Sequence, residues 1–319
     1  MKATIGKDIA RAALLLSDGE LVAIPTETVY GLAANTYDAD AVLRIFQVKR
    51  RPAFDPLIVH VHDSAQVAQV VSHVPLEAEA LMDRFWPGPL TLVLPKSPRV
   101  PDIVTSGLDT VGVRMPAHPM TLGLLRSLDF PLAAPSANPF GYVSPTTARH
   151  VTAQLGDKIP YVLDGGPCAV GVESTIIGWE GGLPVLYRPG GLPLERIEAV
   201  IGAVRPQVKH VLPIAPGMSE SHYAPRKPLF VGDLPALLRE RAGMRIGVIA
   251  FRDHFDTARC ETLSPRGDVD EAARALFTAM RTLDASEVEV ILAEVFPEEG
   301  LGRAINDRLR RAAVKPRMT

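Results

Sequence analysis

The chain has 319 residues, which exceeds the usual size of a single hydrophobic core, so two domains are expected. Apolar residues make up 47% of it and charged residues 22%, a balance that excludes intrinsic disorder. The formal net charge of -2 excludes a strong overall attraction to nucleic acid or to anionic membranes, so any contact with a polyanion must be local.

The cysteines and the apolar runs exclude two further classes of protein. Cys168 and Cys260 are far apart and form no CxxC pair, so neither a structural zinc site nor a disulfide framework is expected. The first residues of the chain carry charges within a short apolar run and lack the small-residue cleavage site of a signal peptide. No later segment approaches the ~18 uninterrupted apolar residues of a membrane span. We therefore expect a soluble cytoplasmic protein.

The first part of the chain predicts helices and strands in alternation. Apolar residues between Ile9 and Leu16 repeat at helical spacing, and a strand is expected from Leu21 to Ile24. Further helices alternate with short β-branched runs, at 57–61, 90–94 and 110–113. Several strand candidates follow one another with only Pro/Gly turns between them. This favours a twisted mixed α/β sheet over the regular cadence of a doubly wound fold.

A proline-rich stretch divides the chain. Residues 206–228 contain five prolines and little periodicity, a composition typical of an extended linker. Beyond it, the pattern predicts a strand at 245–251, a helix at 269–283, a strand at 288–293 and a last helix at 302–313. The predicted organisation is therefore a large domain at 1–205, this linker, and a small α/β domain at 229–319.

Polar side chains follow the first predicted strand directly. The segment PTETVYGL at 25–32 places two hydroxyls, a carboxylate and a phenol at a strand end, where α/β proteins tend to bind ligands. A polar turn in which a threonine caps the next element explains the segment equally well on its own. The segment therefore indicates a site only in combination with others.

A run of cations, KRRP at 49–52, ends the helix that begins near Asp38. Cations at this place can simply satisfy the C-terminal end of a helix dipole. The run leads directly into segment 55–60, however, so it lies at the entry of a buried strand. An arginine fork and a compact lysine charge can together hold a triphosphate without a P-loop, and the chain has no GxxxxGK[ST] motif.

Three further segments have the composition of ligand-facing loops, because small residues let a ligand approach the backbone and Ser, Thr and Asn supply donors. They are the segment 110–116 with Arg114, AAPSAN at 133–138 and GVEST at 171–175. Arg188 ends a strand candidate and is either a surface salt-bridge partner or a second phosphate clamp. Each of these segments alone is equally consistent with a structural turn.

Together the motifs occur in a fixed order, which is PTETVYGLAAN, KRRPAFDPLIVHV, FWPGPLTLVL, DTVGVRMPAHP, APSANPFGYVSPTT, GVESTII and LYRPG. In this order they resemble the YrdC-like threonylcarbamoyl-AMP synthases over residues 10–200. The later segments PGMSESHYAPRKPL and GLGRAINDRLRRAA resemble the linker and the C-terminal domain of the long form of that family. The resemblance implies a twisted mixed sheet with helices around a concave, positively charged cavity, followed by a small α/β domain.

The resemblance also implies roles for individual residues. L-Threonine is expected to contact Thr28, His60, Arg114, Ala134 and Ser174. ATP is expected to contact Lys49, Arg51, Asp55, Thr110, Ser136, Asn138, Ser144, Arg188 and Tyr223. Of these, Lys49, Arg51 and Arg188 are predicted to stabilise the charge that develops on the phosphates. Family members commonly have Gly and Asn where this chain has Arg50 and Asp55, so Asp55 either helps to hold Mg²⁺ or changes the contact to ATP.

The implied activity is that of a nucleotidyltransferase in tRNA processing. Bicarbonate carboxylates the threonine amine, and the carbamate attacks the α-phosphate of ATP and expels pyrophosphate. ATP with Mg²⁺ and bicarbonate are thus the expected co-substrates, without a metal site of the protein's own. His222 and Tyr223 of the linker are expected to close over the active-site mouth. The product, threonylcarbamoyl-AMP, is expected to pass to the machinery that forms tRNA threonylcarbamoyladenosine, and a weak contact with RNA stays open.

Two other functions are consistent with parts of the sequence. A carbamoyl-adenylating enzyme of the hydrogenase-maturation type shares the YrdC-like fold, but this group has larger chains with zinc-binding CxxC pairs that are absent here. A double-stranded RNA-binding module would use a concave basic surface for phosphate contacts, although the near-neutral charge disfavours high affinity. Steep salt dependence of RNA binding without ATP turnover would distinguish such a module from the synthase.

Overall fold

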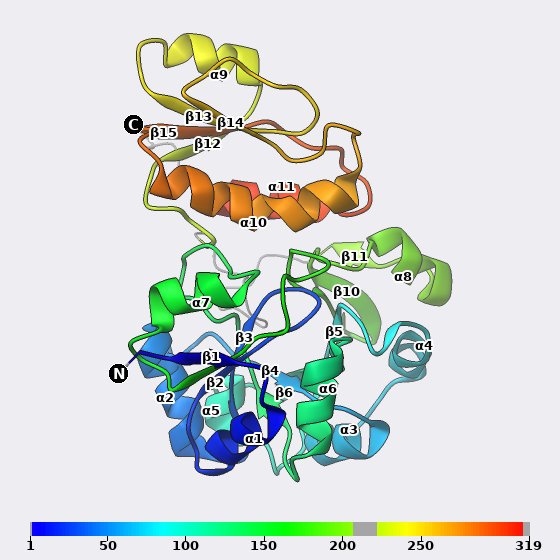
Figure 1. Cartoon of the computed structure of the whole chain (residues 1–319). Coiled ribbons are helices and arrows are strands. Elements are labelled where there is room, and N and C mark those ends of the chain that lie inside the picture. Colours follow the sequence, from blue (N-terminus) through cyan, green and yellow to red (C-terminus); the bar gives the residue numbers. More distant parts are fainter. Residues whose placement is uncertain (1, 207–221, 315–319) are drawn as a thin grey trace.

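The computed structural model describes residues 2–206 and 222–314, which form two α/β units stacked one on the other (Figure 1). The predicted linker at 206–228 lies mostly outside the described residues. Within the two described ranges, no helix is long and apolar enough to cross a membrane.

The first unit is built on a mixed sheet of eleven strands (Figure 1). The strands are β1 (Thr4–Gly6), β2 (Val22–Ile24), β3 (Gly31–Asn35), β4 (Ile58–His60), β5 (Leu90–Pro95), β6 (Thr110–Arg114), β7 (Leu132–Ala133), β8 (Tyr161–Leu163), β9 (Thr175–Glu180), β10 (Leu183–Arg188) and β11 (Arg205–Pro206). Their order across the sheet is β1-β8-β2-β3-β7-β4-β6-β5-β9-β10-β11. The sheet contains both parallel and antiparallel neighbours, which confirms the predicted mixed sheet.

Eight helices surround this sheet (Figure 1). They are α1 (Ile9–Ser17), α2 (Ala39–Lys49), α3 (Ser64–Val70), α4 (Leu76–Phe85), α5 (Asp102–Thr105), α6 (Pro119–Arg126), α7 (Ala148–Leu155) and α8 (Leu194–Ile201). The longer helices follow the helical spacing of apolar residues in the sequence. Asp38 is the N-cap of α2, and its side chain accepts hydrogen bonds from two backbone amides of the first helical turn. Strand β4 is central and runs parallel to β6, and His60 lies opposite Arg114 in the strand register. Two carboxyl ends of parallel strands therefore meet at one edge, where ligands commonly bind.

The second unit is a parallel sheet of four strands in the order β12-β15-β13-β14. Its elements are β12 (Leu229–Val231), α9 (Leu234–Glu240), β13 (Ile246–Ala250), β14 (Arg259–Thr262), α10 (Val269–Ala285), β15 (Val290–Ala293) and α11 (Gly302–Ala312). The predicted strand, helix, strand and last helix are present as β13, α10, β15 and α11. The sequence did not predict β12, α9 and β14, because β12 has only three residues and β14 is a polar strand at the sheet edge.

Helices α10 and α11 of the second unit face the first unit (Figure 1). Arg281 of α10 donates to the Ser144 carbonyl at 3.3 Å, and Arg274 donates to the Ala169 carbonyl at 2.8 Å. Gly171 has a φ of +86°, and a Cβ at this position would lie 2.4 Å from the Arg274 Cα, so glycine permits both the turn and the close approach of α10. Both units share one apolar cluster, to which the first unit contributes Val29, Val143 and Val172.

Candidate active site

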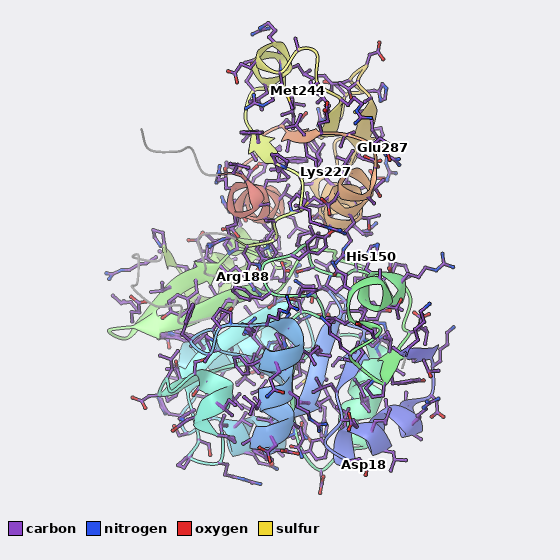
Figure 2. The ribbon with its side chains drawn as sticks, turned by 90° about the vertical axis from the view of Figure 1, so that its left-hand side faces the viewer. Asp18, His150, Arg188, Lys227, Met244 and Glu287 are labelled. Atoms are coloured by element: carbon purple, nitrogen blue, oxygen red, sulfur yellow. The ribbon has the colours of Figure 1, made fainter. Side chains whose placement is uncertain are left out.

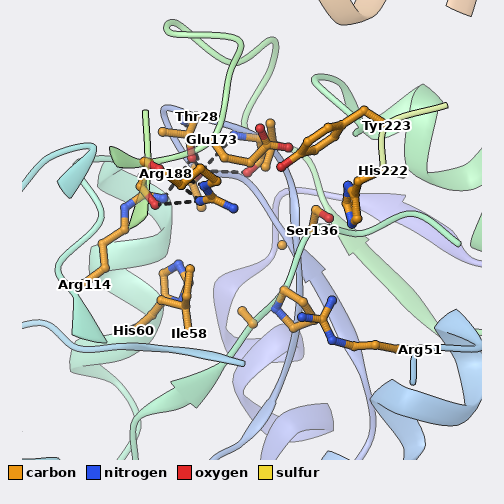
Figure 3. Close-up of a pocket in the computed structure, with 16 residues that line it drawn as sticks. Thr28, Arg51, Ile58, His60, Arg114, Ser136, Glu173, Arg188, His222 and Tyr223 are labelled. Carbon is orange, nitrogen blue, oxygen red and sulfur yellow. Dashed lines mark hydrogen bonds between the residues drawn. The ribbon is translucent and has the colours of Figure 1, made fainter. Parts of the chain in front are cut away.

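A cavity at the carboxyl edge of β4 and β6 brings together most of the residues that the sequence singled out (Figure 3). Of the predicted site residues, the cavity wall includes Thr28, Arg51, His60, Arg114, Ala134, Ser136, Ser174, Arg188, His222 and Tyr223. These residues come from segments that are far apart in the chain. The sheet order and the docked second unit therefore produce one site from motifs that each looked like a simple turn.

Arg114 is held in one orientation on the cavity wall. Its Nη1 donates to Thr28 Oγ1 at 2.9 Å, its Nε donates to the Gly88 carbonyl at 3.2 Å, and its Nη2 lies 2.6 Å from Glu27 Oε1. The other Glu27 oxygen accepts from the Ala117 amide at 3.1 Å. A guanidinium fixed on several sides can pair with a small carboxylate without first losing side-chain freedom. Glu27, which the sequence did not single out, thereby supports the predicted threonine contact.

Ser174 lies on the same wall, directly before β9. Its Oγ shares a 2.7 Å hydrogen bond with Thr91 Oγ1, and both side chains are buried. Arg188 donates to the Ser174 carbonyl from Nε at 3.2 Å and from Nη2 at 3.0 Å, and Nη2 also reaches Ser174 Oγ at 3.3 Å. Ser174 therefore connects the predicted threonine contacts with one of the predicted phosphate contacts.

His60 presents a neutral ring to the cavity at neutral pH. Burial lowers the pKa of His60 to about 3, and the nearby Arg114 guanidinium adds to the shift. Its Nδ1 is buried and has no hydrogen-bond partner among the described residues. A buried polar atom without a partner is costly, so Nδ1 is available to a ligand.

Lys49 lies behind the cavity wall rather than in it. Its Nζ donates to the Ser136 and Asn138 carbonyls, both at 2.5 Å. Burial, together with the Arg51 charge, lowers the pKa of Lys49 well below its ordinary value, although Asp55 opposes this. Lys49 therefore fixes the loop that carries Ser136 and Asn138, two residues predicted to contact ATP.

Arg51 lines the cavity, and residues of the loop that follows it fix the orientation of its side chain. Its Nη2 lies 2.9 Å from Asp55 Oδ2, and it donates to the backbone carbonyls of Asp55 at 2.9 Å and of Pro56 at 2.8 Å. Asp55 is fully buried and is not part of the cavity wall. This geometry does not support the expectation that Asp55 holds Mg²⁺, because its carboxylate faces Arg51 instead.

Arg50 stands where the family resemblance implies glycine, and the backbone conformation at this position explains why glycine fits there. Arg50 is the C-cap of α2 and adopts the left-handed conformation, with a φ of 52°. Glycine adopts this conformation without strain and is the usual residue at such a helix end. The glycine that is common at this position in the family thus fits the turn, and Arg50 tolerates the same turn at some cost in backbone strain.

The structure places three other predicted ATP contacts outside the cavity wall. Ser144 is buried behind it, and its Oγ donates to Glu173 Oε1. Asn138 donates through Nδ2 to the Tyr142 carbonyl at 2.7 Å, while its Oδ1 is buried without a hydrogen-bond partner among the described residues. Thr110 is half-buried at the start of β6, at the end of the strand opposite Arg114.

Glu173 and Arg308 link the cavity to the second unit, and the sequence singled out neither of them. Glu173 lines the cavity, and its Oε2 lies 2.7 Å from Nε of Arg308, a fully buried residue of α11. Burial opposes the ionisation of Glu173, but the Arg308 and Arg188 guanidinium groups lower the pKa of Glu173 below its ordinary value. The segment GLGRAINDRLRRAA contains four arginines, and nothing in its spacing distinguishes the buried one.

His222 and Tyr223 close one side of the cavity (Figure 3). The His222 ring packs edge-on against Phe140 with 5.5 Å between centroids, and the Arg308 guanidinium lies 5.0 Å from the Tyr223 ring centroid. His222 Nδ1 and the Tyr223 hydroxyl are buried without hydrogen-bond partners among the described residues. Both groups are therefore available to a ligand in the cavity.

The electrostatics of the site favour an anion. Among the described residues that line the cavity, three are arginines and one, Glu173, is a carboxylate, while Glu27 and Asp55 pair with Arg114 and Arg51 from behind the wall. Within residues 2–206 and 222–314, no group of three or more His, Cys, Asp or Glu side chains is arranged to hold a metal ion. Guanidinium groups such as these can donate to a carboxylate or to phosphates.

Comparisons with known proteins cover both units. Residues 14–190 match the family model described as Telomere recombination, and residues 192–314 match that described as Threonylcarbamoyl-AMP synthase, C-terminal domain. The threonylcarbamoyl-AMP synthase of Bacillus subtilis is 43% identical, over 96% of this chain and 92% of that protein. The protein of the same name from Halorhodospira halophila is 36% identical, over 49% of this chain and 82% of that protein. The crystal structure of Pyrococcus abyssi Sua5 with L-threonine aligns at 47% identity and a TM-score of 0.91, over 96% of this chain and 94% of that one.

Proposed function

The chain belongs to the threonylcarbamoyl-AMP synthase family in its two-domain form, and on this premise we propose that its cavity joins L-threonine, bicarbonate and ATP. It is an enzyme of the transferase class that forms threonylcarbamoyl-AMP, which serves tRNA modification. The observation that carries the detailed proposal is that one cavity holds three arginines. We assign Arg114 to a threonine side of this cavity, and Arg51 and Arg188 to a nucleotide side.

On the first side, the threonine carboxylate pairs with Arg114 and accepts hydrogen bonds from Thr28 and Ser174. The fixed orientation of Arg114 supports this placement, because its bonds to neighbouring groups leave it little freedom to lose on binding. Ala134 is a small residue in the same wall and leaves room for the threonine side chain. The neutral His60 ring adds a polar contact without adding a second positive charge.

On the second side, Arg51 and Arg188 face the phosphates of ATP. Ser136 and Asn138 lie on the loop that Lys49 holds, and we assign this loop to the nucleotide. Mg²⁺ enters as part of the substrate MgATP, since the described residues offer no metal centre of their own. The Tyr223 hydroxyl and His222 Nδ1 complete the nucleotide side from the linker.

The reaction needs no covalent intermediate with the protein. The threonine amine attacks bicarbonate, water leaves, and a carbamate forms. A carbamate oxygen then attacks the α-phosphorus of ATP, and pyrophosphate leaves with the pair of electrons of the broken P–O bond. Arg51 and Arg188 stabilise the charge on the phosphates, and the closed cavity keeps water from the labile carbamate and adenylate.

The two alternative functions are not favoured. The second unit matches the model of the synthase's C-terminal domain, which a carbamoyl-adenylating enzyme or an RNA-binding module would not be expected to match. We place the reaction in the cytoplasm, because it consumes ATP and serves tRNA. The adenylate is labile and is consumed by a tRNA threonylcarbamoyl-transfer enzyme, and a weak RNA contact would assist that transfer.

The test is a reconstituted reaction with purified protein, ATP, Mg²⁺, labelled L-threonine and bicarbonate. We expect pyrophosphate and labelled threonylcarbamoyl-AMP in equal amounts, and no pyrophosphate in rigorously bicarbonate-free buffer. L-Serine in place of L-threonine is the control for the amino-acid side. Full pyrophosphate release without bicarbonate would contradict the carbamate mechanism.

A further inference from the structure

A buried ion pair crosses from the second unit into the cavity wall. Arg308 of α11 has no exposed side-chain surface, and its Nε lies 2.7 Å from Glu173 Oε2. Its Nη1 donates to the Pro189 carbonyl at 3.0 Å, directly after the strand that ends with Arg188. The second unit thus touches the nucleotide side of the cavity through one charged group.

Both oxygens of Glu173 are occupied in this arrangement. Oε1 accepts from Ser144, and Oε2 accepts from Arg308. The same carboxylate lies close enough to Arg188 for the two charges to affect each other's pKa, and Figure 3 shows the two side chains next to each other. Among the described residues, Arg188 donates hydrogen bonds to Ser174, the residue that follows Glu173 in the chain.

We propose that Arg308 is a positioning residue for the nucleotide site: by pairing with Glu173, it keeps this carboxylate away from Arg188. Arg188 then keeps its hydrogen bonds to Ser174 on the nucleotide side. This inference rests on the proposed function, because it requires that Arg188 binds the phosphates of ATP.

Loss of Arg308 changes the partner of Glu173 rather than merely loosening the interface. A buried carboxylate that loses its counter-ion takes the nearest cation or becomes protonated, because an unpaired buried charge is costly. The nearest remaining guanidinium on the cavity wall is Arg188. Pairing with Glu173 would draw Arg188 off Ser174 and reduce the positive charge that ATP meets.

The test compares Arg308→Met with the double variant Arg308→Met/Glu173→Gln. We expect the single variant to raise the dissociation constant for ATP by at least about tenfold, the scale of one lost charge-assisted hydrogen bond. The dissociation constant for L-threonine should change by less than about threefold. The double variant should restore ATP binding to within about threefold of the wild type, because the competing charge is gone.

Calorimetry on the full chain gives both constants, at a temperature where thermal melts show every variant folded. Arg303→Met is the matched control, because it removes another arginine between the units, paired with Glu195 at 2.7 Å but partly exposed. This control should bind both ligands as the wild type does. Equal loss of ATP binding in the single and double variants, or no loss in Arg308→Met, would overturn the inference.

The two proposals fail in different ways. A wild-type protein that forms no adenylate in the reconstituted reaction would overturn the proposed function. The dissociation constants for ATP are measured without turnover, so they would still decide whether Arg308 acts through Glu173.

Discussion

The two sides of the cavity are built differently. On the threonine side, the side-chain hydrogen bonds and ion pair of Arg114 and Thr28 among the described residues stay within the first unit, in one sheet and its nearest loops. On the nucleotide side, the Ser144 carbonyl accepts a hydrogen bond from Arg281 of α10, Glu173 pairs with Arg308 of α11, and Tyr223 comes from the linker. Figure 2 accordingly shows Arg188 close to the junction of the two units.

This difference indicates which substrate depends on the second unit. A site whose hydrogen bonds close within one sheet is preorganised whether or not the second unit is docked. A site that takes part of its wall from another unit is complete only when the two are docked. Threonine binding should therefore be a property of the first unit, and ATP binding a property of the docked pair.

Deletion of residues 206–319 should have the largest effect and tests directly whether only the nucleotide side depends on the second unit. We expect turnover to be lost, because the deletion removes His222, Tyr223 and Arg308 from the nucleotide side. L-Threonine should still bind within a few-fold of the full chain.

Circular dichroism and a thermal melt of the truncated chain are the controls, since Val29, Val143 and Val172 lose their apolar partners. A folded truncated chain that retains full turnover would contradict the division of the site. Loss of threonine binding in a folded truncated chain would contradict it equally.

The next effect is expected from Arg51→Ala, on the nucleotide side. ATP affinity should fall by about 1.5 to 3 kcal/mol, or ~10- to 150-fold, through the loss of charge-assisted bonds. The sequence alone predicts little change in melting temperature, but the structure alters this expectation. Asp55 is fully buried and would lose its counter-ion, which typically destabilises a fold by about 3 to 5 kcal/mol.

The double variant Arg51→Ala/Asp55→Asn separates the two effects. It should recover most of the melting temperature, because no unpaired charge remains, but it should not recover ATP binding. Recovery of both would show that Arg51 acts only through the stability of its loop. The threonine dissociation constant, which should stay near the wild-type value, is the internal control.

The fold and the composition of the site could largely be predicted from the sequence. The family resemblance carried by the ordered motifs implied one site for Thr28, Arg114, Ser174 and Arg188, and the structure places these four residues in the wall of one cavity. The fold class and the family are confirmed. The roles of these residues in binding remain predictions.

The sequence could not predict which site residues lie behind the cavity wall rather than in it, nor which residues of the two units contact each other. Spacing places Lys49 at a helix end, but it does not say that its ammonium turns back to two loop carbonyls. The pair of Glu173 and Arg308 joins residues 135 positions apart, and its arginine lies in a segment with three others. Only the docking of α11 distinguishes that arginine from its neighbours.

A smaller effect concerns pH and His60. The pKa of His60 is about 3 in the folded protein and about 6.5 in the unfolded chain. The unfolded chain therefore binds the proton first, and the stability that His60 contributes is present above pH 6.5 and is lost as the pH falls toward 3. Between pH 7 and pH 5 the free energy of unfolding should fall by about 2 kcal/mol from this group.

Denaturant melts of His60→Gln should show a correspondingly weaker dependence on pH in this window. The exposed His73 supplies the matched control, since His73→Gln should keep the wild-type pH dependence. An unchanged pH dependence in His60→Gln would show that His60 is not held neutral in the folded protein.

The smallest expected effect tests the threonine side alone, through Thr91→Val. Thr91 is fully buried, and its hydroxyl bonds to Ser174 Oγ at 2.7 Å. Valine fills the same space without the hydroxyl, so Ser174 loses one partner that fixes its rotamer. We expect the dissociation constant for L-threonine to rise by about fivefold, the scale of ~1 kcal/mol for one hydrogen bond, with a smaller change for ATP. The control is Thr105→Val, at an equally buried threonine outside the cavity, which should leave both dissociation constants unchanged. If Thr91→Val weakened ATP binding more than threonine binding, the assignment of Ser174 to the threonine side would be contradicted.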